Sequence, residues 1–120
     1  MIDKSKYPKT YFAFETWYYD RMDDGDYLLN LEDDKEGVGF YSSAEDMQFG
    51  VFNAFFDDYK VYMRVKWYRR TVSGLKWTFC TRNGAYAVTK QDKRTFKRRG
   101  EAYRAGFEAA SEMLEYILNK

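Results

Sequence analysis

Residues 60–70, KVYMRVKWYRR, decide the fold because apolar and polar side chains alternate along them. A period of two places successive side chains on opposite faces of a β-strand. The inward positions are Val61, Met63, Val65 and Trp67. The outward positions are Tyr62, Arg64, Lys66, Tyr68 and Arg70. This stretch therefore predicts a strand with one buried face and one basic, aromatic face.

The pattern continues on the C-terminal side of this strand. TVSG at 71–74 predicts a turn, and LKWTFCT at 75–81 predicts a second strand. Its inward positions are Leu75, Trp77 and Phe79, and its outward positions are Lys76 and Thr78. Asn83-Gly84 predicts a two-residue type I′ turn, because that turn needs positive φ at both positions. AYAVT at 85–89 is the predicted returning strand.

The last segment predicts one long helix from Asp92, its expected N-cap, to Leu118. Apolar side chains recur at helical spacing at Phe96, Tyr103, Phe107, Ala110, Leu114 and Ile117. Small residues repeat every four positions at Ala102, Gly106 and Ala110. They allow a second backbone to approach closely, and that backbone is either the protein's own sheet or the same helix in a homodimer.

The N-terminal half fits more than one structure. TYFAFETWYYD at 10–20 is rich in β-forming residues and predicts a strand buried on both faces, although Tyr11, Phe14 and Tyr18 also fit a helix. YLLNLE at 27–32 and VGFYSS at 38–43 predict a hairpin around DDKEG. The segment 43–58 favours a helix over a strand. The apolar residues that recur there every four positions are Met47, Val51, Phe55 and Tyr59.

These elements together predict an α+β fold. An antiparallel sheet of about four to six strands would be covered by the long C-terminal helix, with a second short helix near 43–58. A chain of 120 residues fits a single domain spanning 1–120. The sequence contains no apolar run of about 18 residues, and its lone Cys80 cannot form an internal disulfide. We therefore expect a cytoplasmic protein.

The absence of histidine removes much chemistry from this chain. It leaves no Ser-His or Cys-His pair, and one cysteine cannot hold zinc. We therefore expect a protein that is not an enzyme and that has no cofactor and no metal. Catalysis by carboxylates or with magnesium is the alternative.

Charge is divided between the two halves of the chain. Residues 1–59 carry 5 Lys/Arg against 14 Asp/Glu, a net charge of −9, whereas residues 60–120 carry 15 against 5, a net charge of +10. The acidic run at 20–36 is not an EF-hand, because Met22 and Leu31 occupy positions that need oxygen ligands. It forms either solvated turns or an acidic patch for a basic partner. The patch residues are Asp20, Asp23, Asp24, Asp26, Asp33 and Asp34.

Basic residues gather in two places. The outward face of 62–70 can stack bases and hold phosphates, although a solvated sheet face has the same composition. KRTFKRR at 93–99 crowds cations at the start of the predicted helix, where the macrodipole disfavours them. This stretch is either the solvated start of a helix or a site for an anion, which would be a phosphate, an acidic partner or the chain's own acidic half. The candidate binding residues are Tyr62, Arg64, Lys66, Tyr68, Arg70, Lys93, Arg94, Lys97, Arg98 and Arg99.

The short domain, the aromatic richness, the divided charge and RRGEAYRAGFEAASEMLEYIL at 98–118 resemble small phage and mobile-element accessory proteins of the anti-defence, anti-CRISPR-like type. The resemblance implies a non-catalytic inhibitor that blocks a host nucleoprotein or nuclease complex, or that sequesters a nucleotide signal. DNA-mimicking inhibitors are strongly acidic, whereas this chain has a net charge of +1. The alternative is a nucleic-acid or nucleotide binder that uses the two basic regions.

Overall fold

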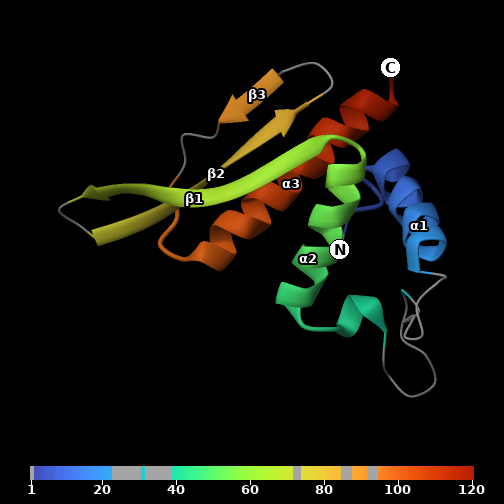
Figure 1. Ribbon diagram of the computed structural model, residues 1–120, viewed down its shortest axis with the longest axis horizontal. Helices are drawn as coiled ribbons and strands as arrows, with labels where there is room; N and C mark the ends of the chain where they lie inside the picture. Colours follow the sequence, from blue (N-terminus) through green and yellow to red (C-terminus); the bar gives the residue numbers. More distant parts are fainter. Residues whose placement is uncertain (1, 23–30, 32–38, 72–73, 85–87, 92–94) are drawn as a thin grey trace.

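Three helices and an antiparallel hairpin surround an aromatic core in the described part of the protein (Figure 1). A computed structural model describes residues 2–22, 31, 39–71, 74–84, 88–91 and 95–120. The elements in chain order are α1 (Pro8–Met22), the 3-10 turn η1 (Phe40–Ser42), α2 (Glu45–Asp58), β1 (Val61–Thr71), β2 (Gly74–Asn83), β3 (Val88–Gln91) and α3 (Arg99–Leu118).

The body of the sheet is the hairpin of β1 and β2, which confirms the strand predicted from the alternating stretch. The strands pair antiparallel from Val61 opposite Asn83 to Thr71 opposite Gly74. Val61 is buried and Tyr62 is exposed, so the predicted faces are confirmed at the start of β1. Thr78 lies on the predicted outward face, which its register confirms, but it is only 1% exposed.

The third strand is short and begins later than the sequence predicted. Asn83 stands opposite Val88, so four residues connect β2 to β3, and the predicted two-residue turn at Asn83-Gly84 is wrong. The Gly84 N–H donates to the Lys60 carbonyl at 2.9 Å. This bond extends the β1–β2 ladder by one position, so the chain does not reverse at Gly84.

The prediction of four to six strands is wrong, because two segments assigned to strands are helical. Residues 10–20 belong to α1, and the described end of the predicted 38–43 strand forms η1. Most of the predicted 27–43 hairpin, namely 27–30 and 32–38, lies outside the described residues. The sheet that is described consists of the β1–β2 hairpin and the four-residue β3 along one end of β2.

Helix α1 buries one face only, which a strand buried on both sides would not do. Phe14 and Tyr18, one helical turn apart, are buried, whereas Phe12 is 71% exposed. Pro8 stands at the first helical position, where its missing N–H costs nothing. The spacing of the aromatic residues in 10–20 fits both a strand and a helix. Their burial on one side only is what a helix produces.

The N-terminus of α1 is capped by a carboxylate from the other end of the chain. Glu115 of α3 accepts hydrogen bonds from the backbone N–H of Thr10 at 2.8 Å and of Lys9 at 3.4 Å. Early helical N–H groups have no partner inside their own helix, so an acceptor from elsewhere stabilises the start. Glu115 therefore joins α1 to α3.

Helix α2 confirms the helix predicted near 43–58, but its buried face differs from the predicted one. Phe52, Phe55 and Phe56 are buried, whereas Met47 and Tyr59 are exposed. The helix ends at Asp58 with Tyr59 as its C-cap, and the next residue, Lys60, is left-handed with φ of 61°. This turn directs the chain into β1.

Helix α3 begins at Arg99 with Arg98 as its N-cap, later than predicted. Phe96 exchanges two backbone hydrogen bonds of 2.8 Å with Trp77, which hold residue 96 beside β2 in an extended bridge. The helix therefore cannot include Phe96. The predicted N-cap, Asp92, lies outside the described residues.

The helix crosses one face of the hairpin, which is called the inner face below (Figure 1). A Cβ at Gly106 would lie 2.8 Å from Met63 Sδ and 3.3 Å from Phe79 Cβ, so the glycine allows α3 to lie close to the sheet. Ala102 and Ala110 are fully buried on the same helix. The small-residue stripe therefore packs within the chain, as the first of its two interpretations predicted.

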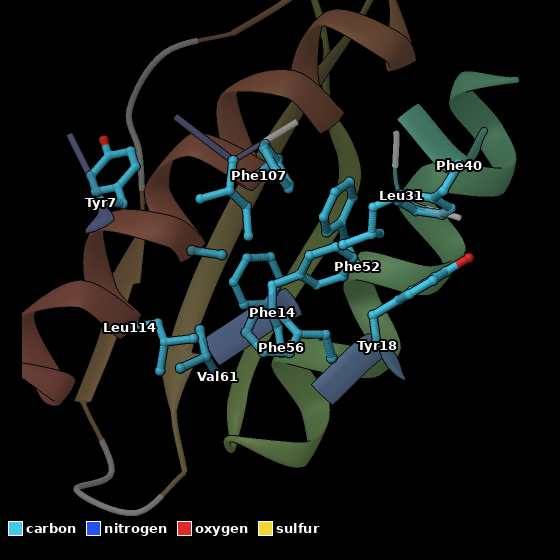
Figure 2. Packing of buried hydrophobic residues seen from close by; sticks show 13 residues of the cluster. Tyr7, Phe14, Tyr18, Leu31, Phe40, Phe52, Phe56, Val61, Phe107 and Leu114 are labelled. Atoms are coloured by element: carbon cyan, nitrogen blue, oxygen red, sulfur yellow. The ribbon is translucent and has the colours of Figure 1, made fainter. Parts of the chain in front are cut away.

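Phe14 lies at the centre of the aromatic core (Figure 2). Its ring centroid lies 4.6 Å from that of Phe52 and 5.2 Å from that of Phe55. Three further rings lie within 6.0 Å, those of Trp17, Tyr18 and Phe40. One side chain thus connects α1, η1 and α2.

We expect Phe14→Ala to lower the free energy of unfolding by about 3–5 kcal/mol, because a buried ring is replaced by a cavity. The matched control on the same helix is Phe12→Ala, which we expect to change it by less than about 0.5 kcal/mol. Urea unfolding followed by circular dichroism measures both values. Equal losses would contradict the central position of Phe14.

We expect Glu115→Ala to lower the free energy of unfolding by about 1 kcal/mol at neutral pH, because the cap of α1 is lost. Burial by itself raises the pKa of Glu115, but hydrogen bonds from Thr10, Asn119 and Lys9 outweigh it, so the pKa is lowered. A lowered pKa means that the stabilisation is present above the unfolded-state pKa and is lost as pH falls through the folded-state value.

The difference in the free energy of unfolding between wild type and Glu115→Ala should therefore become smaller as the pH is lowered. The control is Glu112→Ala, which removes an exposed carboxylate from the same helix. Urea titrations repeated from neutral to acidic pH give the comparison. A difference that stays constant with pH, or that Glu112→Ala reproduces, would show that Glu115 is not the cap.

Candidate functional site

Charge is separated by structural element. The sequences of β1, β2 and β3 contain seven Lys or Arg and no Asp or Glu. Helix α2 contains four Asp or Glu and no Lys or Arg. The sheet is therefore a cationic layer beside an acidic helix, and like charges within the sheet favour an anionic partner.

The register of the hairpin gathers part of the predicted basic set on the face opposite α3. This outer face consists of the positions Tyr62, Arg64, Lys66, Tyr68, Lys76, Thr78, Cys80 and Arg82. Tyr62 stands opposite Arg82, and Arg64 opposite Cys80. Tyr62, Arg64 and Arg82 are exposed, and Lys66 is half-buried. Arg82 was absent from the predicted site, although the same alternation, continued along 75–82, would have found it.

The cations of the outer face are not neutralised by the described part of the chain. Within the described residues, Arg64, Lys66, Lys76 and Arg82 form no ion pair. Other cations do pair with carboxylates, such as Arg104 with Glu45 at 3.0 Å. Among the described residues, the positive charge of the outer face therefore has no carboxylate partner.

Two predicted outer-face residues are placed only by their backbone. Tyr68 stands opposite Lys76, and the register shifts between Tyr68 and Thr71, so Arg70 has no direct partner on β2. Their side chains lie outside the described part of the protein. The hairpin end that carries them extends past the start of α3 (Figure 1).

The second basic region does not join the outer face. Lys93 and Arg94 lie outside the described residues, and Lys97 and Arg98 are exposed ahead of α3. The Arg99 guanidinium lies 5.7 Å from the ring centroid of Trp77, an inner-face residue. The structure therefore divides the predicted basic set between two sides of the sheet.

Arg99 belongs instead to a row of planar groups. Its guanidinium lies 5.5 Å from the Tyr103 ring, and Tyr103 stacks on Phe49 of α2 with centroids 5.4 Å apart and planes 22° from parallel. Cation–π contacts of this kind favour a fixed position for the cation. The row connects β2, α3 and α2.

This row borders a hollow of about 440 Å³ between α2 and α3. The residues that line the α2–α3 hollow are Asp46, Phe49, Gly50, Asn53, Arg99, Gly100 and Tyr103. Except for Arg99, none of them belonged to the predicted site. The available signal was Gly50, a glycine inside a helical pattern, where it costs about 1 kcal/mol relative to alanine.

Of the predicted acidic patch, only Asp20 lies among the described residues, exposed near the end of α1. It borders a shallow depression together with Arg21 and Asp58. Asp58 accepts hydrogen bonds from Trp17 Nε1 at 2.7 Å and from Arg21 at 3.2 Å. These hydrogen bonds to Asp58 join α1 to α2. Burial, and secondarily the negative charge of Asp58, raises the pKa of the neighbouring Asp57.

The described residues contain no group of three or more His, Cys, Asp or Glu that could hold a metal ion. None of the described helices is long and apolar enough to cross a membrane. Comparisons with protein-family models, with curated proteins and with solved structures find no significant match. No function is therefore transferred from a relative.

Proposed function

We propose that the protein is a non-catalytic nucleic-acid-binding protein that holds a single strand on the outer face of its hairpin. The observation that carries the proposal is the β1–β2 register, which brings Tyr62, Arg64 and Arg82 together opposite α3. Neither strand contains an Asp or Glu that would repel phosphate. Lys and Arg neutralise phosphates, and an exposed ring stacks on an unpaired base.

The geometry of the strands suits an extended polyanion. Alternate residues on one face recur at about 6–7 Å along a strand, and cross-strand neighbours lie about 5 Å apart. Arg64 and Lys66 follow one another on β1, and Arg82 lies across from Tyr62. The cations therefore form a row, which a strand of phosphates can follow and a single small anion cannot occupy.

Tyr62 is held in place at one end of this row. A Cβ at Gly84 would lie 2.8 Å from Tyr62 Cε2, so the ring rests against the glycine backbone. The ring is still 43% exposed. A fixed and exposed ring can stack on a base with little loss of side-chain entropy.

We expect Arg64→Glu/Arg82→Glu to weaken binding of fluorescein-labelled oligothymidylate and oligouridylate strongly. The slope of log affinity against log salt should fall by about 1.4, at about 0.7 for each lost phosphate contact. Fluorescence anisotropy over a range of salt concentrations measures both effects. Tyr62→Ala should weaken binding by about 1–3 kcal/mol, whereas Tyr62→Phe should retain it.

The control is Lys4→Glu/Lys120→Glu, which changes the net charge equally but lies outside the outer face. Lys4 and Lys120 contact the rings of Tyr11 and Tyr116 on α1 and α3. Equal weakening by both double variants would mean that only total charge matters. That result, or no binding at low salt, would refute the proposed function.

A second candidate function follows from the separation of charge between α2 and the sheet. A protein with an acidic helix and a cationic sheet can contact both a basic protein surface and the nucleic acid of one nucleoprotein complex. This arrangement supports the inhibitor function that the sequence resemblance implies, in which the partner is a host nucleoprotein or nuclease defence complex.

For this second function, we expect expression of the chain in a bacterium with an active nuclease defence to raise phage plating efficiency. Arg64→Glu/Arg82→Glu should abolish the effect, because the nucleic-acid contact is lost, while Lys4→Glu/Lys120→Glu should retain it. Plating on matched hosts with and without the defence system gives the measurement. Equal plating with and without the protein would contradict this function in that host.

A further inference from the structure

We propose that the α2–α3 hollow binds a nucleoside 5′-monophosphate whose base carries an amino group. The hollow has a volume of about 440 Å³, within the size range of small-ligand sites. It shares no residue with the outer face, so this site is independent of the proposed nucleic-acid surface.

Opposite charges line the hollow without meeting. Asp46 comes from α2 and Arg99 from α3, and within the described residues neither forms an ion pair. Arg99 is held against Trp77 and Tyr103. A ligand that is anionic at one end and carries N–H donors at the other would satisfy both groups at once.

The single cation in the lining specifies the charge of the ligand. Among the described residues, Arg99 is the only Lys or Arg that borders the hollow, so the site matches one phosphate better than a triphosphate. Its planar guanidinium can hold two oxygens of one phosphate while its face remains on the rings. The phosphate is therefore expected at the α3 side.

The polar groups of α2 match the edge of a base. The Asp46 carboxylate accepts hydrogen bonds from base amino groups, and the Asn53 amide both donates and accepts. Phe49 and Tyr103, which stack on each other, provide aromatic surface in the same lining. A free phosphate would use none of these features, which favours a nucleotide.

Gly50 gives the hollow room that the fold itself does not need. A glycine inside a helix costs about 1 kcal/mol relative to alanine. A Cβ at Gly50 would meet no atom within 4 Å, whereas Gly106 on α3 is explained by its contact with Met63. Packing within the protein therefore does not explain the glycine at position 50. Space for a ligand in the hollow does explain it.

Isothermal titration calorimetry of the full chain with GMP, AMP, CMP and UMP tests the proposal. We expect the three nucleotides with amino groups to bind, and UMP to bind about tenfold more weakly because it lacks the amino donor to a charged acceptor. Asp46→Asn should remove this discrimination. No binding of any of the four at millimolar concentration would overturn the proposal.

Variants of the lining locate the site. Arg99→Ala should weaken GMP binding by at least about tenfold, because charged hydrogen bonds are lost. Arg98 is an exposed neighbour outside the lining, so Arg98→Ala should leave the GMP affinity unchanged. Equal losses in both variants would indicate general charge attraction and overturn the site.

Gly50→Leu should block the hollow and abolish GMP binding, and retained affinity in a folded Gly50→Leu variant would overturn the proposal. Gly50→Ala is the second variant in case Gly50→Leu does not fold. It should raise the melting temperature of the protein and weaken GMP binding. An unchanged GMP affinity in Gly50→Ala, with Gly50→Leu unfolded, would also overturn it. Oligonucleotide binding should survive in Gly50→Ala and in a folded Gly50→Leu variant, so failure of the hollow is distinguishable from failure of the outer face.

Discussion

The burial of Phe14 is the constraint on which the rest of the structure depends. Its ring packs on rings from η1 and α2, and Phe52 of α2 in turn contacts Phe107 of α3 at 4.7 Å between centroids. All three helices are thereby fixed through one aromatic cluster. Because α2 leads directly into β1 through Lys60, this packing also fixes where the hairpin leaves the core.

The same packing separates the surfaces. Helix α3 covers the inner face of the hairpin through its close contact at Gly106. On the opposite face, Arg64 and Arg82 are exposed, whereas Thr78 is buried. The acidic residues of α2 lie on a different element from the cations of the sheet. Glu45 and Asp58 of α2 pair with Arg104 and Arg21 rather than with the sheet. Among the described residues, the cations of the outer face are therefore not neutralised, despite a net charge near zero.

The α2–α3 hollow arises where the aromatic core meets the start of the last helix. The bridge between Phe96 and Trp77 delays α3 until Arg99, and this delay places the guanidinium beside Trp77 and Tyr103. Had the helix begun at Asp92, as its apolar spacing predicted, Arg99 would lie two turns inside it. Cations at a helix start oppose the macrodipole, and stacking on two rings offsets that cost for Arg99.

The sequence by itself determined the hairpin, its two faces and the phase of α3, because alternation and helical spacing over these segments allow one solution. It also indicated α2, and it supplied Tyr62 and Arg64 of the outer face. Only the tertiary structure decided that 10–20 is a helix. The aromatic spacing in this segment fits both a strand and a helix, and burial on one side together with the Glu115 cap favours the helix. The hollow was equally hidden, since Asp46 and Arg99 lie far apart in sequence and line the same hollow only because α2 packs beside α3.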